Sequence, residues 1–196
     1  MRILSLKIDN YKSLRDVSFD VPSLMVIVGQ NAAGKSNFAD ALDFLAEVYR
    51  HGLEIAVARK GGYENICFRR TRRSKSPIIF SVLFEIDTED SFSHNLRSKV
   101  EQKLYIEHTF SFRAETQAIR ASFGVSEESI NMSFKKDKWD LMVSRHGEDI
   151  QAKTSGIKNA LTERAEHALN YLQQSTKVHG STSTSLLFET FFYFVP

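Results

Sequence analysis

The octapeptide at residues 29–36 reads GQNAAGKS, which is a complete G-x-x-x-x-G-K-[ST] phosphate loop. In such a loop the glycines allow a tight turn around an anion, and the backbone N–H groups point inward. The lysine, Lys35, reaches the outer phosphates, and the hydroxyl of Ser36 binds Mg²⁺. The motif therefore predicts a site for a nucleoside triphosphate.

The segments on either side of the loop fit this interpretation. Residues Leu24 to Val28 form a continuous apolar run, which predicts a strand covered on both faces. After Ser36 the apolar residues recur at helical spacing, and His51-Gly52 predicts the helix end. An ordinary strand-to-helix turn would explain the glycines, but it gives no reason for a lysine and a serine to follow them.

Composition sets the class of the chain. Its 196 residues are 42% hydrophobic and 26% charged, as expected of one soluble domain with a sizeable core. No apolar run approaches the roughly 18 residues of a membrane span, and residues 1–3 do not begin a signal peptide. We therefore expect a cytoplasmic protein with no membrane partner. Cys67, the single cysteine, excludes an internal disulfide, argues against a cysteine metal site and predicts a packing role.

The net charge of +2 is small, but the basic residues are unevenly placed. Arg69, Arg70, Arg72, Arg73 and Lys75 fall close together, and such a run can neutralise DNA phosphates. It can equally form a solvated hairpin tip that keeps a sheet edge from pairing with other chains. The absence of interleaved aromatic residues favours the hairpin tip.

Alternation of apolar and polar residues predicts two strands before the phosphate loop, at 4–9 and 16–21. Their antiparallel pairing argues against a small nucleotide kinase. Later segments predict a meander with one wet face, then a helix and a polar loop: strands at 78–87, 103–113, 117–124, 128–136 and 138–145, the helix at 155–174 and the loop at 180–185. The fold class expected is α/β, a P-loop NTPase with a mixed sheet and an antiparallel β subdomain.

The strand ending at Asp87 could be mistaken for a second nucleotide motif, in which a buried strand ends in a magnesium-binding acid. Its two-residue period instead indicates an antiparallel strand with one exposed face. The chain also lacks the Asn-Lys-x-Asp motif that reads guanine, so adenine is favoured by elimination.

Two stretches carry a family resemblance: LKIDNYKSL at residues 6–14 and VGQNAAGKSN at residues 28–37. Together they resemble the N-terminal lobe of ABC-type ATPases of the RecF, SMC and OLD group, whose loop typically reads Gly-x-Asn-Gly/Ala-x-Gly-Lys-Ser. The segment RKGG at 59–62 is also similar to stand-alone AAA-type ATPases of this group, many of them linked to mobile elements and phage defence. The resemblance is closest over residues 1–90.

By position, the resemblance implies ATP and Mg²⁺ as cofactors. Lys35 would hold the β- and γ-phosphates, Ser36 would ligate Mg²⁺, and the N–H groups of residues 31–37 would wrap the phosphates. Lys12 lies where the group often has a basic residue near the nucleotide, although a turn lysine in water is an equal alternative. The expected nucleotide contacts are Gly29, Gln30, Asn31, Ala32, Ala33, Gly34, Lys35, Ser36, Asn37 and Lys12.

The chain also departs from the group. The signature segment, the strand ending in Asp-Glu and the switch histidine belong to a C-terminal lobe, and none is recognisable, so we assign no catalytic residue. We interpret 1–196 as a single incomplete head domain. It comprises 1–60 (hairpin, phosphate-loop strand and helix), 61–150 (antiparallel meander) and 151–196 (helix and start of the missing lobe).

Three functions follow from these expectations. The first is an ATPase head that binds ATP, hydrolyses little alone, and acts in DNA processing or phage defence as a head-to-head or head-to-tail homodimer. The second is a nucleotide-gated module for a partner protein or nuclease. The third, a small phosphotransferase, is disfavoured by the opening hairpin.

Overall fold

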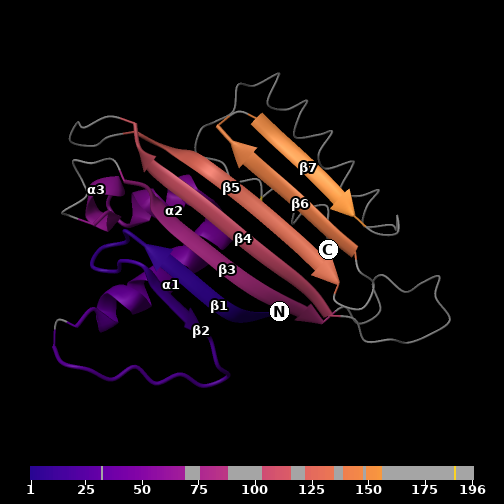
Figure 1. Ribbon diagram of the computed structural model, residues 1–196. Coiled ribbons are helices and arrows are strands. Elements are labelled where there is room, and N and C mark those ends of the chain that lie inside the picture. The colour runs from indigo at the N-terminus through magenta and orange to yellow at the C-terminus, as the bar shows by residue number, and fades with distance from the viewer. Residues whose placement is uncertain are drawn as a thin grey trace.

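Strands dominate the described part of the chain, and they join one antiparallel sheet (Figure 1). The computed structural model describes residues 1–31, 33–68, 76–87, 103–115, 122–134, 139–147, 149–155 and 188. The strands are β1 (Arg2–Asp9), β2 (Val17–Asp20), β3 (Ile78–Asp87), β4 (Lys103–Ala114), β5 (Phe123–Phe134), β6 (Trp139–His146) and β7 (Asp149–Ser155). The helices are α1 (Lys35–His51), α2 (Leu53–Arg59) and α3 (Tyr63–Ile66).

The sheet order within these residues is β2-β1-β3-β4-β5-β6-β7, and each neighbouring pair is antiparallel. Burial alternates along β3, where Ile78, Phe80 and Val82 are buried and the residues between them are partly exposed. The predicted strands at 4–9, 16–21, 78–87 and 103–113 are confirmed as β1 to β4. Because β1 pairs with β3, the sheet is continuous from the opening hairpin into the meander.

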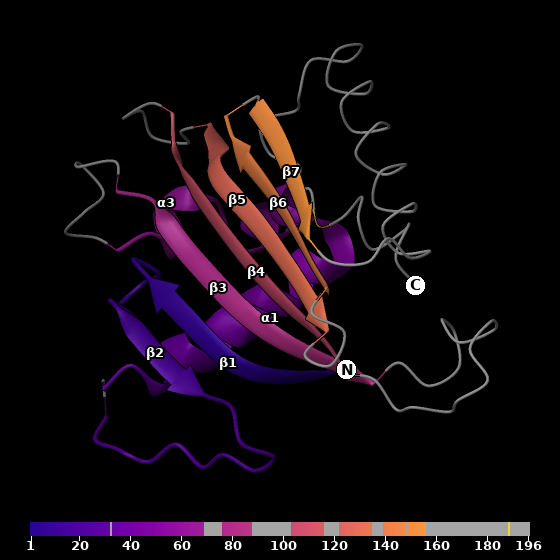
Figure 2. The same cartoon turned by 45° about the vertical axis from the view of Figure 1, so that its right-hand side comes forward.

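Helix α1 lies on one face of the sheet, as Figures 1 and 2 both show. Its Phe44 is fully buried, and its ring centroid lies 5.3 Å from that of Tyr11, 5.5 Å from Phe80 and 6.1 Å from Phe112. Aromatic side chains bury a large apolar area, and these centroid separations are favourable for ring contacts. This cluster joins α1 to β3, β4 and the turn after β1.

Glycine sets both ends of α1. Gly34 precedes its first residue, and Gly52 follows its last, with the Gly52 N–H donating to Val48 O at 2.9 Å. The helix end predicted at His51-Gly52 is confirmed.

Cys67 is buried next to α3, which confirms its packing role. Within the described residues, no helix is long and apolar enough to cross a membrane.

The prediction of a strand at residues 24–28 is wrong. This segment has no strand pairing, and it is exposed: Leu24 by 82%, Val26 by 75% and Val28 by 84%. In both views it runs in the connection between β2 and α1 that loops away from the sheet (Figures 1 and 2). The neighbours of β1 among the described strands are β2 and β3, so the apolar run has no partner there. For the same reason the described sheet is antiparallel rather than mixed.

The boundaries predicted in the meander also need correction. Residues 123–134 form one strand, β5, where the sequence predicted a break between 124 and 128. A register shift between Ser111 and Phe112 lets β5 continue past this point, because the extra residue is absorbed as a bulge. The predicted strand at 138–145 is confirmed as β6, and β7 was not predicted. The predicted helix at 155–174 lies almost wholly outside the described residues, as do the loop at 180–185 and residues 69–75.

Replacing Phe44 with alanine tests the aromatic cluster. Phe44→Ala should lower the free energy of unfolding by about 3 to 5 kcal/mol, because it leaves a cavity under α1. Chemical denaturation measures the change. Ile55→Ala is the matched control, since Ile55 is 47% exposed and its truncation should change stability by less than about 0.5 kcal/mol. Equal effects of the two variants would contradict the packing described.

Candidate nucleotide site

The phosphate loop turns directly into α1. Gly34 has a φ of 93°, a left-handed conformation that favours glycine. A Cβ at this position would lie 3.2 Å from Ser13 Oγ, so the Ser13 side chain would have to shift slightly to admit it. The Phe38 N–H donates to Gly34 O at 2.9 Å, and Asn37 Nδ2 donates to Ser13 Oγ at 2.6 Å. The loop thus leads straight into a helix N-terminus and contacts the turn after β1.

The side chain of Lys35 folds back over its own loop. Its Nζ donates to Gly29 O at 2.5 Å and to Gln30 O at 2.6 Å. An ammonium group at this place can exchange the two carbonyl oxygens for phosphate oxygens, which are stronger acceptors for a charged donor. The contacts of Lys35 therefore bring Gly29 and Gln30 next to the start of α1, and the role of these residues in nucleotide binding stays a prediction. Ala32 lies outside the described residues.

Ser36 is an exposed residue of the first turn of α1, beside Lys35. Among the described residues, no group of three His, Cys, Asp or Glu side chains could hold a metal ion. A serine hydroxyl suits Mg²⁺ bound together with phosphate oxygens and water, because Mg²⁺ in such sites takes few protein ligands. The residues present fit that mode, with Ser36 as the protein ligand.

A second polar cluster lies around Asp40 of α1, which follows the phosphate loop in the sequence. Asp40 accepts hydrogen bonds from Lys12 Nζ at 2.6 Å, from Lys60 Nζ at 2.7 Å and from the Tyr11 hydroxyl at 2.7 Å. Lys60 also donates to Asp43 at 2.7 Å. The cluster links the turn after β1 to α1 and to the end of α2. Within it, Lys12 forms an ion pair with Asp40.

The electrostatics of this cluster follow from those contacts. Partial burial raises the pKa of Asp40, but the hydrogen bonds from Lys12, Lys60 and Tyr11 outweigh it and lower that pKa to about 2. Burial and the Asp40 carboxylate raise the pKa of Tyr11 above its usual range. The tyrosine is therefore a neutral donor and Asp40 a charged acceptor at neutral pH.

The turn that carries Lys12 is strained and anchored. Asn10, Lys12 and Asp16 all have positive φ, with values of 59°, 48° and 46°. The Lys12 N–H donates to Ile66 O at 2.7 Å, and Asp9 Oδ1 accepts from the Asp16 N–H at 2.9 Å. These bonds offset the strain and fix the turn beside the loop.

Sequence reasoning placed Lys12 at the nucleotide but missed Asp40 and Lys60. The only signal for Asp40 is that it lies off the apolar face of α1, and this is true of any solvated helix acid. Lys60 gives no local signal, because its pairing with Asp40 spans 20 positions. The assignment of Lys12 to the nucleotide stays a prediction.

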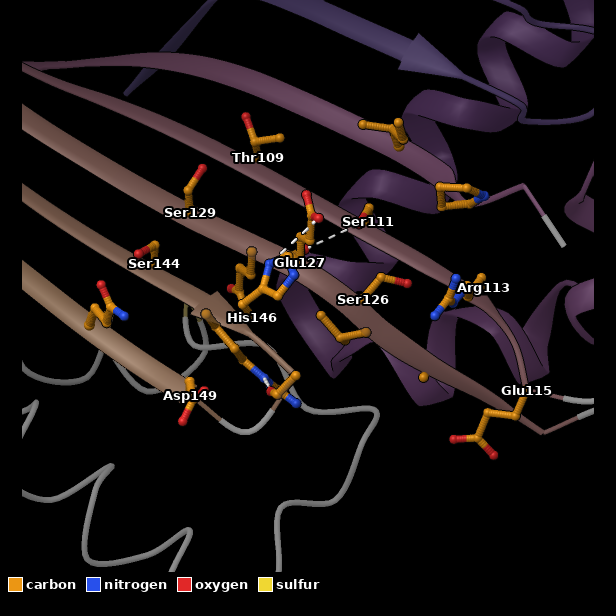
Figure 3. A pocket seen from close by; sticks show the side chains of 18 residues that line it. Thr109, Ser111, Arg113, Glu115, Ser126, Glu127, Ser129, Ser144, His146 and Asp149 are labelled. Atoms are coloured by element: carbon orange, nitrogen blue, oxygen red, sulfur yellow. Dashed lines mark hydrogen bonds and ion pairs between the residues drawn. The ribbon is translucent and has the colours of Figure 1, made fainter.

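A large hollow lies elsewhere, on the sheet face opposite the helices (Figure 3). Its volume is about 1000 Å³, and its lining comes from the segment before β3 and from β3 to β7, with no residue of the phosphate loop. Thr109, Ser129 and Ser144 lie in register across three of these strands. Glu127 and His146 approach to 3.5 Å near one end, and both side chains are largely exposed. This hollow is separate from the nucleotide site.

A glycine-containing loop that opens a helix and carries a lysine is also a feature of P-loop nucleotide-binding proteins. Residues 1–189 match the family described as AAA ATPase domain, so the chain belongs to that family. A comparison with curated proteins found no match. Membership of the family indicates an ATP-binding ATPase, and such proteins usually use Mg²⁺.

Asp40→Asn should weaken the fold in a pH-dependent way. Because the folded-state pKa of Asp40 lies below its ordinary value of 3.8, the carboxylate stabilises the fold above pH 4, and this contribution is lost as pH falls toward 2. We expect Asp40→Asn to cost roughly 1 to 2 kcal/mol at pH 7 and much less near pH 2.

Chemical denaturation at the two pH values measures this difference. Asp43→Asn is the matched control, since Asp43 pairs with Lys60 at 2.7 Å and its side chain is 67% exposed. Its cost should stay below about 0.5 kcal/mol. A loss that is the same for Asp40→Asn at both pH values would contradict the charged-acceptor role.

Proposed function

We propose that this chain is the ATP-binding N-terminal part of an ABC-type ATPase of the RecF, SMC and OLD-like group, acting in DNA processing or phage defence. The observation that supports it is the phosphate loop, with left-handed Gly34 opening a 17-residue helix and Lys35 inside the turn. The AAA ATPase family match supports ATP as the nucleotide.

Binding would replace the internal contacts of Lys35. Its Nζ, which now donates to the carbonyl oxygens of Gly29 and Gln30, would donate to the β- and γ-phosphates instead. The free N–H groups at the start of α1 and the partial positive charge of the helix add to the site. Bound Mg²⁺ neutralises phosphate charge, and Ser36 is the residue that would hold it.

The exposed apolar segment at 24–28 supports the incomplete-head interpretation. A run that is apolar on successive residues is suited to a strand covered on both faces, yet here Leu24 and Val28 are more than 80% exposed. Contiguous exposed apolar residues mark surfaces that a partner covers. In our proposal a strand of the C-terminal lobe pairs with this segment and completes the nucleotide site.

The same proposal limits hydrolysis by the chain alone. Phosphoryl transfer to water needs a base or a water-orienting residue next to the metal and phosphates, and the sequence assigns none. Turnover would then require the second lobe and a homodimer that encloses the nucleotide. Contact with DNA through Arg69, Arg70, Arg72 and Arg73 is part of this proposal.

A second candidate is a nucleotide-gated module that recruits a partner protein or nuclease with negligible hydrolysis. The exposed segment at 24–28 favours it too, because ATP binding next to this segment could order it for a partner. The two candidates differ in turnover once the second lobe is supplied. A small phosphotransferase has less support, since the β1–β2 hairpin precedes the loop.

Lys35→Ala should lower affinity for Mg²⁺-ATP by about tenfold to a hundredfold, because it removes a charged donor worth roughly 1.5 to 3 kcal/mol. Isothermal titration calorimetry measures the affinity. Lys103→Ala is the control, since it removes an exposed lysine that pairs with Glu85 on the sheet. Equal affinities of Lys35→Ala and the wild type would contradict the site.

Phosphate release by the same proteins tests whether the chain hydrolyses ATP without a second lobe. The wild-type chain should bind Mg²⁺-ATP with little release of phosphate. Fast turnover by this chain, abolished in Lys35→Ala, would mean that the described residues already contain a complete hydrolytic site.

A further inference from the structure

The turn after β1 has two central residues, Lys12 and Ser13, between buried flanks. Tyr11 and Leu14 form an isolated antiparallel bridge, and the Leu14 N–H donates to Tyr11 O at 2.8 Å. Tyr11 is fully buried and Leu14 is 8% exposed, so both flanks are packed into the core. The exposed Ser13 is therefore presented from a rigid support, which a precise contact requires.

Ser13 contacts the start of α1. Its Oγ accepts a hydrogen bond from Asn37 Nδ2 at 2.6 Å. The same Oγ would lie 3.2 Å from a Cβ at Gly34, so it also lies beside the junction between the phosphate loop and the helix. Asn37 is the third residue of α1. One serine hydroxyl therefore contacts the first turn of the helix from the side.

The first turn of α1 lacks the groups that commonly stabilise a helix N-terminus. Gly34, at the N-cap position, provides no side-chain hydrogen bond, and the first turn contains no acidic residue. A serine or aspartate at this position would stabilise the helix, because its side-chain oxygen accepts from N–H groups of the first turn. Those N–H groups are the ones that bind an anion. A conventional cap would thus compete with a bound phosphate.

The hydrogen bond between Ser13 and Asn37 avoids this competition. It joins two side chains, so it does not engage the backbone N–H groups of the first turn. Helix ends fray, and a contact that holds the Asn37 side chain opposes fraying at this end. The Phe38 N–H donates to Gly34 O at 2.9 Å, and this is a bond that fraying would open.

We propose that Ser13 is a positioning residue for the phosphate loop. Through Asn37 it stabilises the first turn of α1, and it thereby fixes the N–H groups that bind phosphate. This inference rests on the proposed nucleotide site. Because the turn is already held in the ligand-free protein, less conformational entropy is lost when nucleotide binds. Ser13 thus raises nucleotide affinity through the helix rather than through a contact of its own.

Hydrogen exchange at the Phe38 amide tests the first step, in the full chain without nucleotide. Ser13→Ala should speed this exchange by about twofold to tenfold, the factor expected for the loss of one hydrogen bond. The Gly52 amide, which donates to Val48 O at the other end of α1, is the internal control and should not change. Unchanged exchange at Phe38 would overturn the inference. Equal acceleration at both amides would mean a general loss of stability and would overturn it too.

Calorimetric titration with Mg²⁺-ATP tests the second step. Ser13→Ala should lower the affinity by about twofold to tenfold, and Ser13→Thr, which keeps the hydroxyl, should retain the wild-type affinity. Ser18→Ala is the matched control, because Ser18 is exposed on β2 and pairs with Lys7 of β1 in the same hairpin. It should bind as the wild type does. A loss in Ser13→Thr as large as in Ser13→Ala would contradict the role of the hydroxyl.

A double-mutant cycle tests Asn37 as the partner of Ser13. Asn37→Ala keeps the backbone N–H and removes the amide that donates to Ser13, so it should also lower the affinity. Adding Ser13→Ala to this variant should cause no further loss, because the hydrogen bond is already absent. Fully additive losses would mean that the two residues act independently, and this would overturn the inference.

The results separate this inference from the proposed function. If the wild type binds Mg²⁺-ATP and Ser13→Ala binds it equally well, the positioning role alone is overturned. If the wild type fails to bind Mg²⁺-ATP, the proposed function is overturned, and the role of Ser13 in nucleotide binding with it, whatever the Phe38 amide shows.

Discussion

The packing of α1 against the sheet is the contact on which the rest of the structure depends. Phe44 inserts among the rings of Tyr11, Phe80 and Phe112, and this fixes the helix over β3 and β4. The N-terminal end of the same helix forms part of the phosphate loop, and its C-terminal end meets the buried His108–Glu128 pair. The position of this one helix thus determines the geometry of both the phosphate loop and the contacts of the His108–Glu128 pair.

Ion pairs add to this packing in the half of α1 that follows the phosphate loop. Asp40 accepts from Lys12, Lys60 and Tyr11, so the strained turn after β1 and the end of α2 are held to the helix just behind the loop. Lys12 and Lys60 are neutralised within the protein, whereas the ammonium of Lys35 donates to the carbonyl oxygens of Gly29 and Gln30. Among the loop and cluster lysines, Lys35 is thus the one whose contacts a phosphate can replace without breaking an ion pair.

Local patterns in the sequence predicted the elements that local forces determine. Helical periodicity and Gly52 gave the extent of α1, and alternation gave β1 to β4 and β6. The failures depend on distant residues: the segment at 24–28 needs a partner strand, and the bulge opposite Ser111 and Phe112 merges two predicted strands into β5. The phosphate loop was recognisable because its chemistry is contiguous. The Asp40–Lys60 pairing was not, because it exists only after α2 folds back along α1.

The central claim is that the phosphate loop binds ATP by exchanging the internal contacts of Lys35 for phosphate oxygens. The most direct test is an experimental structure of the chain with Mg²⁺ and a non-hydrolysable ATP analogue. The account predicts Lys35 Nζ on the β- and γ-phosphates, Ser36 on Mg²⁺, and the Gly29 and Gln30 carbonyls released. An analogue bound elsewhere, or a bound state in which Lys35 still contacts both carbonyls, would contradict it.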